Sequence, residues 1–233
     1  MSEREIFFVT GVGRGLGRTL ALHLLQAGHR VFGSTRSGTC DVEVEGCVAM
    51  QLDDAASVHA GATEVAELVD RVDVLVNCAG TDARAFGAAD QQRGPFDVDA
   101  ASFNAVFATN VTGPMVLTTA LLPQLRAGRN PLVLNVSSQL GSMEVAATIG
   151  RDTAYCVSKA GLNMLTVKSA AALRSDGVAV VALHPGWVQT DMGGPSAALT
   201  VDESAGAIVA TMAGLGPADS GRFVRWDGTD HPW

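Results

Sequence analysis

Short apolar segments alternate with longer segments of helical periodicity along the whole chain. Runs rich in β-branched and aromatic residues predict strands at residues 5–10, 30–35, 47–52, 72–76, 132–137, 178–183 and 222–225. Apolar residues spaced three and four apart predict helices at about 15–27, 54–69, 101–125, 154–173 and 202–212. The longest of these helices is interrupted by Gly113-Pro114.

Strands that alternate with helices pair in parallel through right-handed crossovers. The runs at 72–76, 132–136 and 178–183 are apolar on both faces, as strands covered by helices on both sides are. No Pro/Ser-rich linker divides the 233 residues. We therefore predict an α/β fold in one Rossmann-type domain spanning 1–233. It has a doubly wound parallel sheet of about seven strands, with helices on both faces and the catalytic residues in the same domain as the cofactor site.

The amino-acid composition limits the kinds of molecule that the protein can be expected to bind. The net charge is −8 and no Lys/Arg cluster is present, which argues against nucleic acid or an anionic membrane as partner. No apolar run approaches the length of a membrane span, and the polar start lacks the apolar core of a secretory signal. The four cysteines form no C-x-x-C pair, so we expect reduced thiols, no metal site and a cytoplasmic location.

A glycine-rich loop follows the first predicted strand and opens the first predicted helix, the context in which such a loop cradles a phosphate. The G-x-G-x-x-G register fails because Leu16 and Arg18 occupy the required positions. The pattern T-G-x-x-x-G-x-G fits Thr10, Gly11, Gly15 and Gly17. Amides at a helix N-terminus suit a pyrophosphate, so we predict a dinucleotide site; the alternative is a glycine-rich turn without a ligand.

Tyr155 and Lys159 stand four residues apart in a predicted helix, which places a phenol and an ammonium on one face. A free tyrosine, with a pKa of about 10, is a poor acid–base near neutral pH. A nearby Lys⁺ and an oxidised nicotinamide would lower that pKa by favouring the phenolate. A phosphate cradle followed by the Ser138 hydroxyl, this phenol and this ammonium suggests nicotinamide-dependent carbonyl chemistry.

The end of the second predicted strand bears on the choice of cofactor. An NAD site places an acid about 20 residues past the glycines to bind the ribose 2′-hydroxyl, and none stands there. Arg36 occupies the position instead, and Arg14 lies in the glycine loop. Guanidinium groups suit a 2′-phosphate, so we predict NADP(H), with NAD(H) less favoured. The alternative is that both arginines are solvated surface residues.

The order of the motifs resembles the short-chain dehydrogenase/reductase family over nearly the whole chain. These motifs are T-G-x-x-x-G-x-G, N-x-A-G at 77–80, Ser-Ser at 137–138, Y-x-x-x-K at 155–159 and P-G-x-V-x-T at 185–190. HPGWVQTDMGG at 184–194 and the ending DGTDHPW at 227–233 resemble the C-factor-like and sniffer-like carbonyl reductase branch.

The resemblance implies a catalytic set of Asn110, Ser138, Tyr155 and Lys159. Ser138 would donate a hydrogen bond to the substrate oxygen. Because 17 residues separate it from Tyr155, more than the commonest family spacing, Ser142 is the alternative. Pro114 lacks the N–H that would bond the carbonyl of Asn110, and the family uses the matching asparagine in a proton relay; a structural kink is the alternative.

The same resemblance implies the cofactor-binding set. Asp53 matches the family's adenine-binding acid or is the N-cap of the next helix, and Val188 and Thr190 match positions that hold the nicotinamide amide. The full set is Thr10, Gly11, Gly13, Arg14, Gly15, Leu16, Gly17, Arg36, Leu52, Asp53, Asn77, Ala79, Gly80, Tyr155, Lys159, Pro185, Gly186, Val188 and Thr190.

These features predict an NADP(H)-dependent oxidoreductase that interconverts a small-molecule carbonyl and a secondary alcohol. The alternatives are a dinucleotide-binding signalling or redox-sensing protein and an NAD-dependent alcohol dehydrogenase. We interpret His184 as structural, and residues 81–98, the loop after Ser138 and 187–200 as walls of the substrate pocket. Surplus apolar residues in helices 101–125 and 154–173 predict a homodimer or homotetramer.

Overall fold

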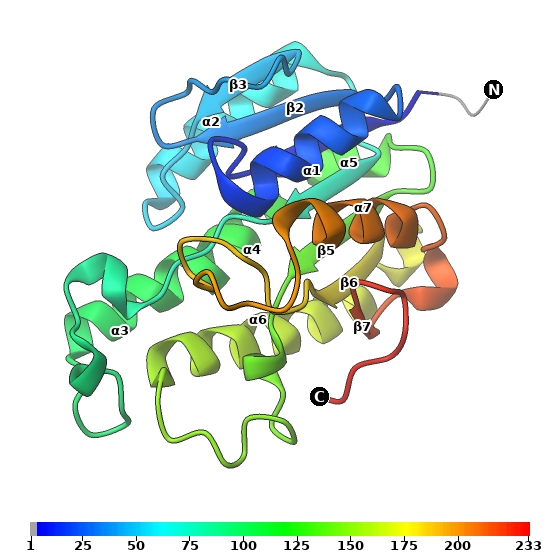
Figure 1. Cartoon of the computed structure of the whole chain (residues 1–233). Coiled ribbons are helices and arrows are strands. Elements are labelled where there is room, and N and C mark those ends of the chain that lie inside the picture. Colours follow the sequence, from blue (N-terminus) through cyan, green and yellow to red (C-terminus); the bar gives the residue numbers. More distant parts are fainter. Residues whose placement is uncertain (1–3) are drawn as a thin grey trace.

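Seven parallel strands form one sheet in the order β3-β2-β1-β4-β5-β6-β7 in the computed structural model, which describes residues 4–233 (Figure 1). The strands are β1 (Ile6–Thr10), β2 (Arg30–Thr35), β3 (Gly46–Ala49), β4 (Val74–Asn77), β5 (Leu132–Val136), β6 (Ala179–His184) and β7 (Phe223–Arg225). All seven predicted strands are present, and the predicted single-domain, doubly wound α/β fold is confirmed.

Helices cover both faces of the sheet. The helices α1 (Gly15–Gln26) and α7 (Val201–Met212) lie side by side on one face, in front of the strands in Figure 1. The opposite face carries α2 (Ala55–Leu68), α4 (Gly113–Ala120), α5 (Leu122–Arg126) and α6 (Thr153–Ala172), while α3 (Ala100–Phe107) packs against α6. Strand residues alternate between two cores: Phe8 packs on the α2 side and Phe7 and Val9 on the α1 side.

The predicted interruption of the 101–125 helix near Gly113-Pro114 is present, and the segment is divided further than the sequence indicated. It is divided into α3, a π-helical turn (Ala108–Thr112), α4 and α5. Pro114 cannot donate to the carbonyl of Asn110, and the N–H of Gly113 bonds the carbonyl of Ala108, five residues back. An added Cβ at Gly113 would lie 2.5 Å from the carbonyl oxygen of Leu52, so the widened turn packs tightly on the loop after β3.

The third strand ends three residues earlier than the predicted 47–52. The N–H of Met50 still bonds the carbonyl of Thr35, but a turn follows in which the N–H of Asp54 bonds the carbonyl of Gln51. Leu52 is buried in the core and Asp53 is exposed. Among residues 4–233, no helix has the combination of length and hydropathy needed to cross a lipid bilayer.

Candidate active site

The glycine-rich loop connects β1 to α1 at the carboxyl edge of the sheet, beside the point where strand order reverses between β1 and β4. Gly11 and Gly15 have φ values of +79° and +54°, which glycine adopts without strain. An added Cβ at Gly17 would lie 2.4 Å from the carbonyl oxygen of Gly11, so the loop and the helix pack backbone against backbone.

The first turn of α1 can accept an anion. Within the described chain, no side chain caps this helix and its first turn holds no acidic residue. The unsatisfied N–H groups and the positive end of the helix dipole therefore face the loop. Gly13 lies close to Thr35 at the end of β2, at 3.2 Å from an added Cβ to the threonine methyl, and Leu16 packs partly against the core.

Thr10 fastens the N-x-A-G turn to the end of β1. Its hydroxyl oxygen accepts hydrogen bonds from the N–H groups of Cys78 and Ala79, each at 3.0 Å. The side chain of Asn77 is buried, and its amide nitrogen donates to the side-chain oxygen of Asn135 at 2.8 Å. Asn77 therefore joins β4 to β5 within the sheet, while Ala79 and Gly80 form the edge beside the glycine loop.

Tyr155 and Lys159 occupy the first two turns of α6. The Lys159 ammonium is buried, donates to the carbonyl of Val136 at 2.9 Å and lies 5.6 Å from the centre of the Tyr155 ring. Burial lowers the pKa of Lys159 to about 8. Burial also raises the pKa of Tyr155 to about 12, and the Ser138 hydroxyl opposes that shift by hydrogen bonding. Gly80 adjoins this group, since an added Cβ would lie 3.4 Å from Lys159 Nζ.

The structure distinguishes the two candidate serines by their surroundings. Ser138 follows β5 and lies within hydrogen-bonding influence of the Tyr155 phenol. Ser142 is buried, and its hydroxyl accepts from the N–H of Val145 at 3.1 Å, which stabilises the next turn. The Tyr155 phenol is thus influenced by Ser138, while the Ser142 hydroxyl bonds its own turn.

Asn110 lies in the π-helical turn with its side chain fully enclosed, at 1% exposure. Its Oδ1 accepts from the N–H of Thr81 at 2.8 Å, and its Nδ2 donates to the Thr81 carbonyl at 2.8 Å and to Ser158 Oγ at 2.9 Å. Ser158 in turn donates to the carbonyl of Tyr155 at 2.7 Å. Thr81 and Ser158 were not predicted from the sequence. Their positions give the only indication: Thr81 directly follows the N-x-A-G motif, and Ser158 directly precedes Lys159.

The two arginines expected at the cofactor phosphate lie at the same edge. Arg36 is exposed in the turn after β2. Arg14 is exposed too, and its Nη1 pairs with Asp191 Oδ2 at 2.8 Å. The N-cap of α2 is Asp54, whose Oδ1 accepts from the N–H of Ala56, so the alternative interpretation of Asp53 as that cap is wrong.

The P-G-x-V-x-T segment reaches the glycine loop from β6. The methyl carbon of Thr190 lies 3.7 Å from the position of an added Cβ at Gly15. Val188 is buried and forms a bridge with Leu199. Pro185 is fixed by a hydrogen bond from Ser204 to its carbonyl at 2.7 Å, and Gly186 has a φ of +87°. Thr190 therefore joins the glycine loop, whereas Leu52 stays in the core.

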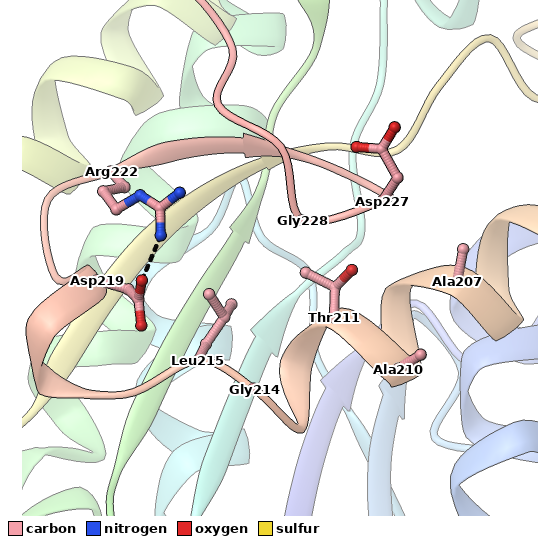
Figure 2. A pocket seen from close by; sticks show the side chains of 9 residues that line it. All are labelled: Ala207, Ala210, Thr211, Gly214, Leu215, Asp219, Arg222, Asp227 and Gly228. Atoms are coloured by element: carbon pink, nitrogen blue, oxygen red, sulfur yellow. Dashed lines mark hydrogen bonds and ion pairs between the residues drawn. The ribbon is translucent and has the colours of Figure 1, made fainter.

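A hollow of about 460 Å³ lies elsewhere, between α7 and the turn after β7. Figure 2 shows its lining, which includes Asp227 and the ion pair between Asp219 and Arg222. It shares no residue with the predicted site, so it is not the place of the chemistry described above. Within residues 4–233, no group of three or more His, Cys, Asp or Glu side chains is arranged to hold a metal ion.

His184 ends β6 and orients the loop that begins at Ser138. Its Nδ1 accepts from the N–H of Gln139 at 3.2 Å, which requires a neutral ring with its proton on Nε2. Burial, with smaller contributions from His231 and Arg225, lowers the pKa of His184 to about 3. The geometry supports the structural interpretation of this residue.

Comparison with known proteins agrees with this geometry. The sequence model described as short chain dehydrogenase matches residues 5–199. C-signal of Myxococcus xanthus is 43% identical over 164 residues, which cover 70% of this chain and 93% of that protein.

Two solved structures superpose on nearly the whole chain, and each comparison covers 99% of both proteins. NADPH-bound carbonyl reductase from chicken fatty liver has a TM-score of 0.87 and 30% identity. Carbonyl reductase Sniffer of D. melanogaster has a TM-score of 0.85 and 29% identity. The expected resemblance to the C-factor-like and sniffer-like branch is confirmed.

We expect the protein to lose stability in acid partly through His184. The unfolded chain protonates this histidine below about pH 6.5, whereas the folded protein keeps it neutral, so the free energy of unfolding falls as pH falls from about 6.5 toward 3. The loss between pH 7 and 5 amounts to about 2 kcal/mol. His184→Asn keeps an acceptor for Gln139 but does not titrate. Urea unfolding at pH 7 and pH 5 should show a smaller drop in the free energy of unfolding for the variant than for the wild type. Equal drops would contradict the contribution assigned to His184.

Proposed function

The chain belongs to the short-chain dehydrogenase family, and from that premise we propose that it is an NADP(H)-dependent oxidoreductase that interconverts a carbonyl compound and a secondary alcohol. One observation gives this proposal its main support. The Tyr155 phenol, the Ser138 hydroxyl and the buried Lys159 ammonium gather at the carboxyl edge of the sheet, beside the end of β5. One strand, β4, separates them from the glycine loop and the uncapped N-terminus of α1.

The residues present fit a dinucleotide. An added Cβ at Gly17 would collide with the loop backbone, and the α1 amides face the space in front of the loop. When bound there, the nicotinamide group supplies or accepts the hydride. The chain's own residues manage the proton: Tyr155 gives one to the substrate oxygen during reduction, and Ser138 donates a hydrogen bond to that oxygen and stabilises its developing charge.

The electrostatics of the site indicate why Lys159 is essential to this mechanism. Burial is the main cause that raises the pKa of Tyr155 to about 12, which disfavours the phenolate needed to accept a proton during alcohol oxidation. The Lys159 ammonium lies 5.6 Å from the centre of the ring, and an oxidised nicotinamide would add a second positive charge. Both favour the phenolate. Alcohol oxidation should therefore rise with pH and carbonyl reduction should fall.

Cofactor selection rests on charge at the end of β2. Arg36 is exposed at the position where an NAD site carries an acid, and Arg14 faces the same edge from the glycine loop. A guanidinium forms charge-assisted hydrogen bonds with a 2′-phosphate, which NAD(H) lacks. The similar carbonyl reductase from chicken was solved with NADPH, which supports the same preference here. The four free cysteines suit action in the cytoplasm.

A signalling role is the second candidate, and the likeness to C-signal favours it. Signalling by dinucleotide binding alone needs the glycine loop but not the assembled Tyr155, Ser138 and Lys159. Oxidation of NADPH in the presence of a panel of carbonyl compounds separates the two: turnover supports the oxidoreductase, and cofactor binding without turnover on any of them supports signalling.

Replacement of Tyr155 by Phe should abolish most turnover, because the ring packing stays while the titrating hydroxyl is lost. We expect kcat to fall about 10²- to 10⁴-fold with NADPH affinity nearly unchanged. Lys159→Ala should impair both turnover and NADPH affinity, since Lys159 also belongs to the expected cofactor-binding set. Near-wild-type turnover of Tyr155→Phe on a good substrate would rule the mechanism out.

Replacement of Arg36 by Ala should weaken NADPH binding far more than NADH binding. Loss of one charge-assisted phosphate contact costs about 1.5–3 kcal/mol, or roughly 10- to 100-fold in Kd. Arg174, which follows α6 at the opposite edge of the sheet, gives a matched control, Arg174→Ala, with no change expected. Fluorescence titration with each cofactor measures the two Kd values in each variant. Equal weakening of NADPH and NADH binding in Arg36→Ala would contradict the role assigned to Arg36.

We also expect the protein to self-associate through α4 and α6. Met164 on α6 and Met115 on α4 are 57% and 45% exposed, and a hollow of about 170 Å³ lies between the two helices. We propose that a second copy covers this apolar surface. Light scattering should show a dimer or tetramer for the wild type and for the control Leu68→Glu on α2, and monomers for Met164→Glu. A monomeric wild type at micromolar concentration would refute it.

A further inference from the structure

The 187–199 segment forms a compact loop at the edge of the predicted site. Its ends meet in the bridge between Val188 and Leu199, and the Trp187 indole N–H donates to the carbonyl of Gly193 at 2.9 Å. Two neighbouring residues of this loop are held by arginines from different parts of the chain. Arg14 pairs with Asp191, and Nη2 of Arg84 donates to the carbonyl of Met192 at 2.8 Å.

Arg84 is itself fixed by a carboxylate two residues earlier. Its Nη2 bonds Asp82 Oδ2 at 2.5 Å and its Nε bonds the same oxygen at 3.0 Å. Asp82 Oδ1 also accepts from the N–H of Arg84 at 2.9 Å. The Arg84 guanidinium thus joins Asp82, which is 9% exposed, to Met192 in the 187–199 segment, 108 residues after Arg84 in the sequence. The planar fork of arginine makes both contacts at once.

Asp82 is held close to the first turn of α6 by a chain of hydrogen bonds. The preceding residue, Thr81, binds the Asn110 amide through both its N–H and its carbonyl. Asn110 donates to Ser158, and Ser158 donates to the carbonyl of Tyr155. Burial is the main cause of the raised pKa of Tyr155, and the hydrogen bond with the Ser138 hydroxyl lowers that pKa. The negative charge of Asp82 adds to the rise. The hydrogen-bond chain and the direction of this contribution both place Asp82 on the Tyr155 side of the loop after β4.

We propose that Asp82 and Arg84 form a positioning pair for the reaction. Arg84 fastens the 187–199 segment beside the substrate and balances the charge of Asp82 next to Tyr155. Neither residue touches the reacting atoms. The inference rests on the acid–base role proposed for Tyr155, and it assigns to the loop after β4 a function that the motif N-x-A-G does not include.

Other charged and titratable groups of the described chain also lie around Tyr155. On α6 and its start these are Lys159, Cys156 and Asp152, and the Ser138 hydroxyl faces the phenol from the end of β5. Asp152 is paired with Arg93 at 2.8 Å, as Asp82 is paired with Arg84. Asp152 has a second arginine, Arg151, at 3.7 Å. Removal of Arg84 takes away the cation that balances Asp82, which disfavours the phenolate.

The chain offers a direct way to measure this effect, because Tyr155 is its only tyrosine. The ultraviolet absorbance of tyrosinate therefore reports the ionisation of Tyr155 alone. We would titrate the NADP⁺ complexes of the wild type, Arg84→Met, Asp82→Asn and the double variant. The midpoint should rise by about one pH unit in Arg84→Met, fall in Asp82→Asn and return toward the wild type in the double variant. These shifts should shrink in high salt, since the pair is partly exposed.

Steady-state kinetics with an aromatic aldehyde as probe tests the contact to Met192. Arg84→Met should raise KM for the aldehyde about 10-fold while the Kd for NADPH changes less than two-fold. Arg84→Lys keeps the charge but not the fork, so it should restore the titration midpoint of Tyr155 and leave KM raised. The control Arg222→Met breaks a similar ion pair beside β7 and should change neither.

Midpoints that stay unchanged, or that move the same way in Arg84→Met and Asp82→Asn, would overturn the electrostatic role of the pair. An unchanged KM in Arg84→Met would overturn the role at the 187–199 segment. These failures differ from failure of the proposed function: if Tyr155→Phe retains turnover, the acid–base assignment is wrong whatever the pair does. If Tyr155→Phe is inactive and the midpoints do not move, the function stands and the positioning pair does not.

Discussion

The site depends on one buried ammonium group. Lys159 is 4% exposed, and a charge so far from water is stable only where polar groups replace its hydration. The carbonyl of Val136, at the end of β5, supplies one such group at 2.9 Å. An added Cβ at Gly141 would come within 2.9 Å of the lysine's own backbone carbonyl and Cβ, so small residues are required where the loop after β5 crosses α6. The strand end, that loop and the helix must therefore assemble together around the charge.

The same constraint explains why polar residues penetrate the apolar layer between β4, β5 and α6. Asn77 donates to Asn135, and Asn135 donates to Thr166 on α6 at 2.9 Å. Ser137 donates to Asn163 on the same helix at 2.6 Å. These buried bonds fix the rotation of α6, because an unpaired amide in the core costs about 1–3 kcal/mol. Tyr155 and Lys159 inherit that fixed rotation, and the distance between ring and ammonium follows from it.

The order of strands and helices could be predicted from the sequence, because it follows from local hydrophobic periodicity and because β1, β4, β5 and β6 are buried on both faces. The glycine loop and the spacing of Tyr155 and Lys159 were likewise local patterns. The Gly113-Pro114 interruption of the 101–125 helix was also a local signal. The end of β3 and the π-helical turn at Ala108–Thr112 were not local signals, because they depend on contacts between distant segments such as the packing of Gly113 against Leu52. The partners of Arg14 and Arg84 lie 177 and 108 residues away, so only the folded chain shows that both arginines hold one loop.

That arrangement gives the 187–199 segment two anchors of different character. The contact of Arg84 is to a backbone carbonyl, and the same guanidinium is also bonded to a nearly buried acid. The contact of Arg14 is to the carboxylate of Asp191, with both side chains about four-fifths exposed, and such pairs contribute little stability. A cofactor phosphate that engaged Arg14 would compete with Asp191 for the same guanidinium. Of the two anchors, the Arg84 contact is therefore the one that the rest of the fold holds in place.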